Sequence, residues 1–528
     1  MAGRDSRRAP WPSSARAFVV ATWLLAGLAG ALFTWLKLFQ YRHWLLTAWD
    51  TGIYLHAMAR IASGDWTGWN GLNGRPIAGD AAQWIVYALA PLLRLGGPPL
   101  LFALQGFALA FGAVPLALLA WRRWGSFWAL VMLPVLYAFP GVIAGVVVEW
   151  HPDALGFCFL AWAVYALESG RGRLLWPLLL ATLAVKNQAA VAVAGLGLAL
   201  LLAGLGRRRI DRRALPAIGL PLALLLAEER WILPRLAPGL RDHTIAASYG
   251  YLGSSLGGIL LALLRHPAYL AGAVTRHAAS WALALGFFAG LPLLAPLRAL
   301  PALAVLLVNG LSRLSLPNRP YTQYTLWAAP FLAWGAVEAA AAWSRLRPAE
   351  RLGRAALPAL LLLAAAGGLT LRATVPELAW RLRPLPPPLE RSLDRAAALV
   401  PRQALLFGQT GTVVAFYDRP AIGAEPYDAY DGFVAGACRQ GLGGLRLWLL
   451  WAPGRSFAPI VPLRQQERDL AAILASGPFR LRYAADGVLL YESAVPAERL
   501  RPAACLREKT GATRLPGAGG AASGREKA

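Results

Sequence analysis

The chain has 528 residues, of which 57% are hydrophobic and only 15% are charged. A soluble protein of this length needs more charge to cover its surface, so the composition excludes an ordinary soluble enzyme. The formal net charge of +25 comes mainly from arginines that cluster between long apolar blocks. Such clusters are typical of the cytoplasmic loops of membrane proteins, so we expect a membrane protein that binds no nucleic acid.

Apolar blocks follow one another along residues 17–373, which predicts an all-α polytopic bundle of about 11–12 transmembrane helices. The first block, residues 17–36, is preceded by arginines, so residues 1–16 should lie in the cytoplasm. The next stretch, residues 39–80, is rich in tryptophan, which prefers the membrane interface. We expect this stretch to form a loop outside the cell, with helices that lie on the bilayer.

Two of the apolar blocks are not simple spans. The block at 126–147 contains Pro134 and Pro140, and it is predicted to be broken or re-entrant. The block at 174–205 is too long for one span, and a lysine in mid-bilayer is costly. We therefore expect this block to divide into two shorter helices that meet at Lys186.

The arginine-rich segment 207–213 fixes the predicted topology, because positive loops stay in the cytoplasm. Counting spans from there places residues 234–277 and the whole C-terminal part outside the cell. The arginine-rich loop 345–354 falls inside, as its charge requires. The same count places Arg122 and Arg123 outside, against the usual bias of positive charge.

Composition changes after the last apolar block. A Pro-rich linker is predicted at 374–388, a small α/β domain outside the cell at 389–495, and a disordered tail at 496–528. Within the domain, helices are expected at 389–400 and 465–475, and strands at 404–407, 445–451, 479–483 and 488–491. The last two strands flank Asp486-Gly487, which is a favoured hairpin turn.

Familiar enzyme motifs are missing from the sequence, which has no Walker A loop, no His-Glu-x-x-His and no Cys-x-x-Cys. The three cysteines are Cys158, Cys438 and Cys505, and no pair of them has metal-ligand spacing. Cys438 and Cys505 are able to form a disulfide if both lie outside the cell, although nothing in the sequence requires it. The remaining candidates for chemistry are polar residues at the ends of apolar helices.

Two aspartates of the outer loop are such candidates. Asp50 is placed to act as a general base or a metal ligand. Alternatively, Thr47-x-x-Asp50 is a capping box with Asp50 in the first turn of an interfacial helix, and both interpretations stand. Asp80 directly precedes an apolar helix that we expect to begin at Ala81, so capping of that helix is preferred to a role in substrate binding.

The segment Glu149-Trp150-His151-Pro152-Asp153 brings ionisable groups together between two apolar blocks. Charged residues at membrane depth usually have a function, and Glu149 and His151 are candidate catalytic residues. His151 is able to hold a proton or a phosphate near neutral pH. The alternative is a solvated helix start with Pro152 as the first helical residue.

Lys186 and Arg319 are candidate anion ligands. Lys186 is able to neutralise a phosphate, or it is an ordinary lysine that reaches the membrane surface from a helix end. Arg319 is able to grip a phosphate or carboxylate, or it anchors the helix at the interface together with Tyr321 and Tyr324. Gln105, inside an apolar helix, is expected to form an interhelical hydrogen bond.

An ordered series of short motifs resembles a bacterial family of predicted polytopic membrane proteins of unknown function. The series is Trp49-Asp50-Thr51-Gly52-Ile53-Tyr54, Ala90-Pro91-Leu92, Leu104-Gln105-Gly106, His151-Pro152-Asp153, Val185-Lys186, and Tyr324 with Pro330-Phe331. That family is similar in layout to the GT-C glycosyltransferases, which transfer a sugar from a polyprenyl-phosphate carrier at the outer face of the membrane. The resemblance covers residues 20–495 and implies a multi-pass protein of the bacterial cytoplasmic (inner) membrane.

The resemblance implies roles for four of these candidates. Asp50 would be the base or the ligand of a divalent cation, Mg or Mn, and Lys186, Arg319 and His151 would contact the phosphate of a polyprenyl-phosphate sugar donor. Beside these, Glu149 and His151 are predicted to be catalytic, and Asp80, Asn187, Tyr321 and Tyr324 are predicted to join Lys186 and Arg319 in binding the substrate.

The sequence departs from the family pattern at three positions. Ala81, Asn187 and Gln323 stand where the family often has histidine, glutamate and histidine. These departures put the substrate or the activity in doubt, so three hypotheses are kept. The first is a GT-C-like glycosyltransferase, the second a transporter or flippase of a lipid-linked or anionic substrate, and the third a non-catalytic membrane scaffold.

Overall fold

The computed structural model describes residues 13–80, 82–125, 127–236, 248–314, 316–319, 322–346, 353–373, 375–424, 428–452, 462–501 and residue 505. The chain divides into two compact units. Unit 1 comprises residues 1–46, 57–69 and 75–384, and unit 2 comprises residues 47–56, 70–74 and 385–528. Two short pieces of the predicted outer loop therefore belong to the same unit as the C-terminal domain.

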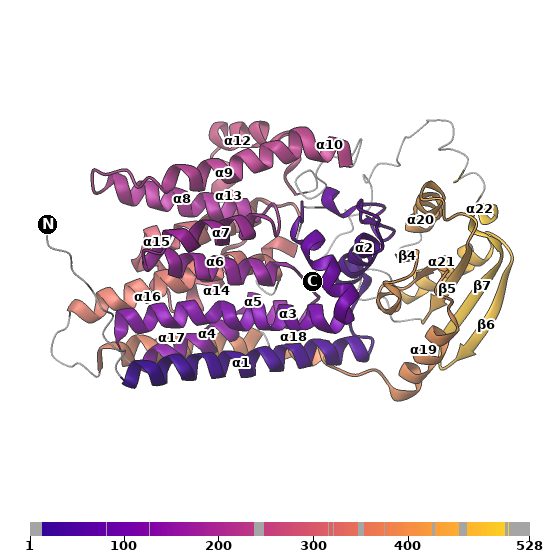
Figure 1. Ribbon diagram of the computed structural model, residues 1–528, viewed down its shortest axis with the longest axis horizontal. Helices are drawn as coiled ribbons and strands as arrows, with labels where there is room; N and C mark the ends of the chain where they lie inside the picture. Colours follow the sequence, from indigo (N-terminus) through magenta and orange to yellow (C-terminus); the bar gives the residue numbers. More distant parts are fainter. Residues whose placement is uncertain are drawn as a thin grey trace. The chain divides into compact units, whose positions relative to one another are not determined.

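Unit 1 is a helical bundle, as the apolar blocks predict (Figure 1). Its helices are α1 (Ser13–Arg42), α3 (Ile85–Trp124), α4 (Met132–Tyr137), α5 (Pro140–Val147), α6 (Asp153–Glu168), α7 (Gly172–Leu183), α8 (Ala189–Leu205), α9 (Ala214–Ala227), α10 (Leu233–Leu236), α12 (Leu256–Arg265), α13 (Ala268–Arg276), α14 (Ala278–Gly286), α15 (Pro296–Leu311), α16 (Ala329–Leu346), α17 (Gly353–Ala373) and α18 (Val375–Arg381). Helix α2 (Ile53–Ala62) begins in unit 2 and continues into unit 1.

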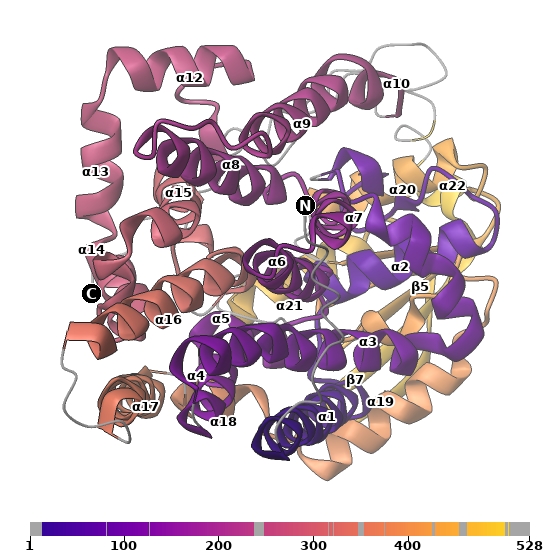
Figure 2. The same cartoon turned by 60° about the vertical axis from the view of Figure 1, so that its left-hand side comes forward.

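Among the described residues, α1 and α3 are each long and apolar enough to cross a membrane alone. Two bent pairs reach that length together: residues 127–147, which bend by 54°, and α12 with α13, which bend by 92° (Figure 2). The first bend confirms the predicted break in the block at 126–147, and the α7–α8 break confirms the predicted division at Lys186. Helices α12 and α13 fall in a segment where the sequence predicted an outer loop without spans.

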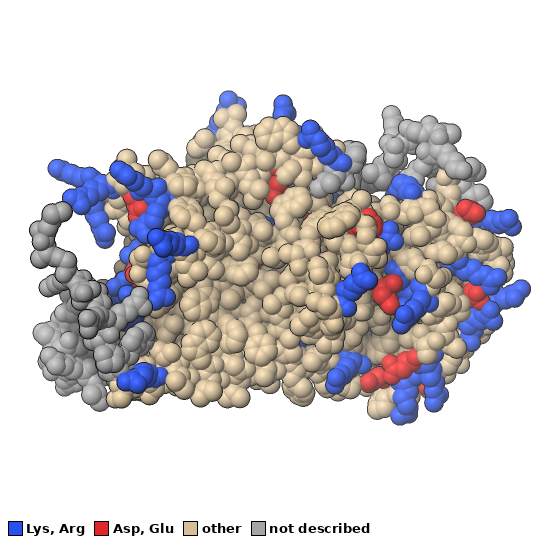
Figure 3. All heavy atoms as spheres, in the orientation of Figure 1, with Lys and Arg blue, Asp and Glu red and all other residues tan. Residues whose placement is uncertain are grey.

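The surface of α1 shows why this bundle needs lipid around it. Val20, Leu24 and Leu28 recur every fourth residue and are 56%, 63% and 70% exposed, while Phe18 and Ala26 on the other face are buried. Figure 3 shows a broad area of unit 1, over the middle of α1, α3 and α6, that carries almost no charged side chain on the face drawn. Apolar surface of this extent is solvated by acyl chains and not by water.

Helix α3 corrects the predicted position of Arg122 and Arg123. The helix changes direction at Gly97, where φ is 63°, but it does not turn back. In its last turn, Arg123 forms one ion pair with Glu168, at the end of α6, and another with Glu338, whose Oε1 lies 2.6 Å from Arg123 Nε. Glu168 lines the same pocket as residues of the arginine-rich segment 207–213, so Arg123 lies at the same end of unit 1 as that segment. The prediction that placed Arg122 and Arg123 on the opposite side of the membrane from segment 207–213 was therefore wrong. Two apolar stretches were counted as separate spans where the chain forms one kinked helix.

Unit 2 contains a five-stranded sheet with the strand order β4-β3-β5-β7-β6. Its elements are α19 (Pro387–Leu399), β3 (Leu405–Gly408), β4 (Ala421–Ala424), α20 (Asp428–Arg439), β5 (Arg446–Trp451), α21 (Leu463–Leu474), β6 (Phe479–Ala485), β7 (Val488–Pro496) and α22 (Ala497–Leu500). Strand β3 pairs in parallel with both β4 and β5, and the other pairings are antiparallel. The predicted strands and helices of this domain are confirmed, whereas β4 and α20 were not predicted.

The ends of the predicted segments differ from the observed elements. Helix α18 lies within the segment predicted as a linker, and α22 lies within the segment predicted as a disordered tail. The predicted hairpin turn is present, with φ of 49° at Asp486 and 79° at Gly487. Positive φ at both central residues matches the twist of the flanking strands.

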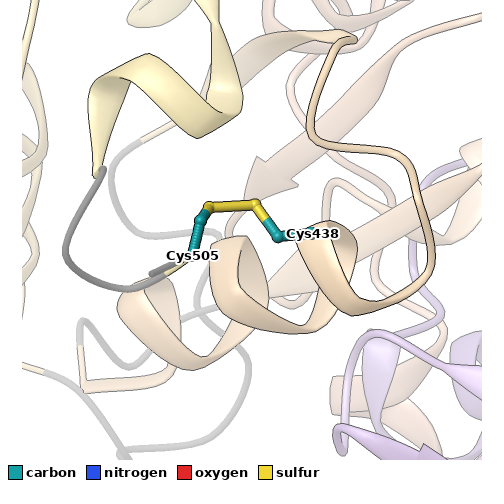
Figure 4. Close-up of a disulfide and its surroundings, with 2 residues drawn as sticks. All are labelled: Cys438 and Cys505. Carbon is teal, nitrogen blue, oxygen red and sulfur yellow. A yellow bond between two sulfur atoms is a disulfide. The ribbon is translucent and has the colours of Figure 1, made fainter. Parts of the chain in front are cut away.

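A disulfide joins Cys438, on α20, to Cys505, with their Cα atoms 5.7 Å apart (Figure 4). The sequence left this pairing open, and the structure supplies it by bringing α20 close to the end of the chain. A cross-link across 67 residues restricts the unfolded chain and so stabilises the folded state.

Glu492 on β7 links two arginines of the neighbouring strands. Its carboxylate accepts hydrogen bonds from Arg446 on β5, at 2.7 Å, and from Arg482 on β6, at 2.6 Å. Burial opposes ionisation of this carboxyl, but the two arginines outweigh it and hold its pKa below the ordinary value of 4.5.

We expect this glutamate to give unit 2 a stability that depends on pH. Its contribution is fully present above pH 4.5 and is lost as the pH falls through the lower pKa of the folded state. Thermal unfolding of the full-length protein between pH 3 and 7 should show this loss, and the variant Glu492→Gln should show a smaller dependence on pH. Equal curves for the two proteins would contradict the assignment.

Candidate active site

The connection between α5 and α6 carries the ionisable segment that the sequence singled out. Glu149, His151 and Asp153 are 4%, 1% and 0% exposed. Asp153 is the first residue of α6, and Pro152 precedes the helix as its cap. The alternative of a solvated helix start is therefore wrong, because the packed helices of unit 1 enclose all three side chains.

Polar side chains from two helices hold this connection in place. Gln105 of α3 donates from Nε2 to the carbonyl of Glu149 at 3.1 Å, and its Oε1 accepts from the backbone N–H of His151 at 3.2 Å. Lys37 of α1 donates from Nζ to the same Glu149 carbonyl at 3.2 Å, and Gln40 donates to the carbonyl of Val147 at 2.6 Å. These side chains satisfy backbone groups that the break between α5 and α6 leaves without helical partners. The interhelical hydrogen bond predicted for Gln105 is confirmed.

Gln105 is expected to be important for stability for this reason. In the variant Gln105→Leu the buried N–H of His151 loses its acceptor, at a cost of about 1–3 kcal/mol in free energy of unfolding. Thr182→Val is a matched control, because the Thr182 hydroxyl donates only to Leu178 within α7 and its loss should cost less than about 0.5 kcal/mol. Thermal unfolding in detergent compares the two variants. Equal shifts would show that Gln105 does not hold the segment.

Asp153 is the centre of a buried group of charged and aromatic side chains. Its Oδ1 accepts a hydrogen bond from Trp327 Nε1 at 2.8 Å and lies 3.7 Å from Lys186 Nζ. The same ammonium group lies 4.8 Å from the centre of the Tyr324 ring. Lys186 is 5% exposed, so it does not reach out to the membrane surface as the alternative interpretation proposed.

His151 lies in the connecting segment, outside the flanking helices, and several positive charges surround it. The charges of Lys186, Lys37 and Arg381 all act on its imidazole.

Asp80 does not occupy the position that the sequence predicted. It follows the single 3-10 turn Ile77–Gly79, and the next helix, α3, begins only at Ile85, so Asp80 does not cap it. Between them, the side chain of Trp84 donates from Nε1 to Glu228 Oε1 at 2.8 Å. Glu228 is 3% exposed and opens a π-helical turn, a feature that is frequent at functional sites.

The other predicted substrate contacts differ in their surroundings. Asn187 is half-buried in the break between α7 and α8, next to Lys186. Arg319 is exposed, and it has no ion pair within the described part of the chain. Tyr321 lies outside the described residues. The structure thus groups Glu149, His151, Lys186 and Tyr324 in unit 1, whereas no ion pair between described residues links Arg319 to them.

Asp50 belongs to unit 2, and its backbone is strained. Its φ of 58° and ψ of −75° lie in a region that non-glycine residues rarely adopt. The Thr47 side chain caps no helix here, so the predicted capping box is wrong. Strain of this kind costs about 1–3 kcal/mol and persists where the surrounding structure enforces it, often at functional sites.

Two hydrogen bonds within unit 2 hold the chain on either side of Asp50. The backbone N–H of Ala48 donates to the carbonyl of Thr410 at 2.6 Å, and Asn70 Nδ2 donates to the carbonyl of Ile53 at 2.6 Å. Thr410 follows β3, the strand that has a parallel neighbour on each side. The carboxyl end of such a strand is where α/β sheets usually place their functional groups.

A complete metal site is not assembled by the protein at Asp50. Within the described residues, no three His, Cys, Asp or Glu side chains come close enough together to hold a metal ion. A divalent cation at Asp50, Mg or Mn, stays a prediction, because such an ion is often held by one or two carboxylates together with substrate phosphates. No catalytic step below is assigned to a metal.

Several residues of the site were not predicted as site residues from the sequence. Lys37, Gln40 and Trp327 come from helices or turns far apart in the chain, and only the tertiary structure brings them to Glu149 and Asp153. The position of Lys37, a single charge near the end of the apolar first helix, was the one available signal. Nothing in the local sequence distinguished Trp327 from the other 21 tryptophans.

Comparison with known proteins shows a family to which the sequence matches and solved structures with a similar fold. Residues 42–386 match a family described as "Predicted membrane protein (DUF2079)". The fold is similar to the crystal structure of ArnT from Cupriavidus metallidurans bound to undecaprenyl phosphate, with a TM-score of 0.51, 15% identity, and coverage of 90% of this chain and 98% of that chain. The same protein in the apo state gives a TM-score of 0.48, with 15% identity and coverage of 91% and 98%. No curated protein matches.

Proposed function

Because the chain belongs to the DUF2079 family of predicted membrane proteins and has a GT-C-like fold, we propose that it is a membrane glycosyltransferase. Its donor would be a sugar linked to polyprenyl phosphate at the outer face of the bacterial cytoplasmic membrane. The observation that carries this proposal is the buried group of Lys186, Asp153, Glu149 and His151 within an otherwise apolar bundle. Buried charge at membrane depth is costly, and it is kept where it has a function.

The proposed reaction forms one bond and breaks another. A hydroxyl oxygen of the acceptor attacks the anomeric carbon of the sugar, and the bond from that carbon to the phosphate oxygen breaks. The acceptor proton passes to a carboxylate, which we assign to Asp50, and the bond electrons remain on the polyprenyl phosphate. Lys186 is assigned to the leaving phosphate, because an ammonium group stabilises negative charge strongly in a dry environment.

The outer face is supported by two features of the chain. A disulfide such as Cys438–Cys505 forms and persists in oxidising compartments and is rare in the cytoplasm. The arginine-rich segment 207–213 is typical of a cytoplasmic loop and belongs to unit 1. The disulfide favours a location of the C-terminal domain outside the cell, and the arginine-rich segment favours a cytoplasmic location for its own end of unit 1.

The test uses the purified full-length protein in lipid nanodiscs. Polyprenyl-phosphate sugars and acceptor material, both extracted from bacterial membranes and cell walls, are supplied, and free polyprenyl phosphate is measured by mass spectrometry. This product is common to every sugar, so the donor need not be known. Release that depends on both Asp50 and Lys186 supports the transferase. Movement of the intact lipid-linked sugar between leaflets would indicate a transporter, and neither activity would indicate a scaffold.

A further inference from the structure

A second polar site lies in unit 1, apart from the buried group around Asp153. Helix α8 begins shortly after Lys186, and its 17 residues extend about 25 Å to Leu205. There, a pocket of about 560 Å³ opens between the ends of α6, α8 and α15 and the segment 206–213. This volume lies within the range of about 300–1,000 Å³ that is usual for small-molecule sites.

The pocket is basic. Four arginines and two carboxylates line it, which leaves an excess of two positive charges. Arg213 pairs with Asp211 at 2.7 Å, and Arg298 pairs with Glu168 at 3.1 Å. The other two arginines, Arg207 and Arg209, have no ion pair with any described residue. Their guanidinium groups are therefore available to a ligand.

The local backbone conformation itself positions Arg207 and Arg209 at the pocket. The carbonyl of Gly204 accepts from the N–H groups of Arg207, at 3.0 Å, and Arg209, at 2.9 Å, so the chain folds back onto the end of α8. A Cβ atom at Gly204 would meet the carbonyl oxygen of Arg209 at 2.3 Å, which only glycine avoids. The fold brings Arg207 and Arg209 to the pocket, whereas Arg208 and Arg212 of the same segment do not line it.

We propose that this pocket binds a phosphate group, supplied by the headgroup of an anionic lipid. Guanidinium groups match phosphate oxygens with paired hydrogen bonds, which a lysine ammonium does not reproduce. The remaining wall is apolar and includes Leu167, Leu200 and Leu297, which suits the glycerol and upper acyl region of a lipid. The proposal does not depend on the transferase, because none of the residues assigned to transfer lines this pocket.

A simpler interpretation is that the arginines only keep this loop in the cytoplasm, a role in which lysine serves equally well. The test therefore keeps the charge constant. The pocket variant is Arg207→Lys with Arg209→Lys, and the matched control is Arg208→Lys with Arg212→Lys, in the same segment but outside the pocket. A third variant, Ala203→Phe, fills the pocket and leaves all charges in place.

Binding is measured on the purified full-length proteins by native mass spectrometry, with two probes. One is dioctanoyl phosphatidylglycerol, and the other is glycerol 3-phosphate, which carries the phosphate without the acyl chains. We expect the pocket variant and Ala203→Phe to weaken lipid binding at least about tenfold, while the control keeps the affinity of the original protein. Melting temperatures without ligand show whether each variant is folded.

The possible results distinguish a lipid site, a site for a soluble phosphate compound and the absence of a site. Loss of lipid binding in the pocket variant but not in the control supports the site, and weak glycerol 3-phosphate binding then identifies the lipid as its source. Equal binding of both probes, lost in the same variants, supports a site for a soluble phosphate compound and overturns the lipid assignment. Equal behaviour of the pocket and control variants overturns the site.

Discussion

Replacing Lys186 by methionine is expected to abolish transfer and to destabilise the protein by about 3–5 kcal/mol. Methionine keeps most of the length of the side chain but leaves the carboxylate of Asp153, which is fully buried, without the ammonium group 3.7 Å away. The hydrogen bond from Trp327 Nε1 remains, but one neutral donor does not offset a buried charge. Thermal unfolding and release of polyprenyl phosphate are measured on the same preparations.

The double variant Lys186→Met with Asp153→Asn separates structure from function. It removes both charges and keeps a side chain of similar shape beside Trp327, so most of the lost stability should return. If Lys186 contacts the leaving phosphate, activity stays lost in the double variant. Recovery of activity together with stability would show that the lysine only balances Asp153, and the assignment of Lys186 to phosphate would then be abandoned.

Asp50→Asn and Asp50→Gly are expected to lower the rate of transfer by about 10²–10⁴, because both remove the proposed base. Their effects on stability should differ. Asparagine keeps the side-chain shape and tolerates positive φ, so stability changes little, whereas glycine adopts φ of 58° without strain and should stabilise the protein by about 1 kcal/mol. An Asp50→Gly protein that is more stable than the original but inactive would show that the backbone strain at Asp50 is retained because its carboxylate is needed for transfer.

Ala289→Gly provides the control for the backbone effect. Ala289 also has a positive φ, of 54°, but its methyl group carries no chemistry. Glycine there should stabilise the protein slightly and leave transfer unchanged. If Asp50→Gly destabilises the protein, the interactions of the Asp50 side chain outweigh the relief of backbone strain. If Asp50→Asn retains full activity, Asp50 is not the base, and the scaffold hypothesis gains support.

Predictions of single elements succeeded where one physical rule decided the outcome. The break at Lys186 follows from the cost of a lysine in mid-bilayer, and the turn at Asp486-Gly487 follows from the backbone that a hairpin requires. Capping predictions failed at Thr47 and Asp80. A cap motif is short and local, and in both places packing and neighbouring backbone groups determined the conformation instead.

Sequence by itself determined the class of this protein, its division into a helical bundle and a small α/β domain, and the family that it resembles. These properties follow from long apolar blocks, charge clusters and ordered motifs, which are readable along one chain. Only the tertiary structure decided which polar residues meet. Lys37, Gln105, Asp153, Lys186 and Trp327 come together because helices far apart in sequence pack side by side, and no local pattern encodes that contact. The same is true of the arginine pocket, since only the fold shows that Arg207 and Arg209 line it whereas Arg208 and Arg212 do not.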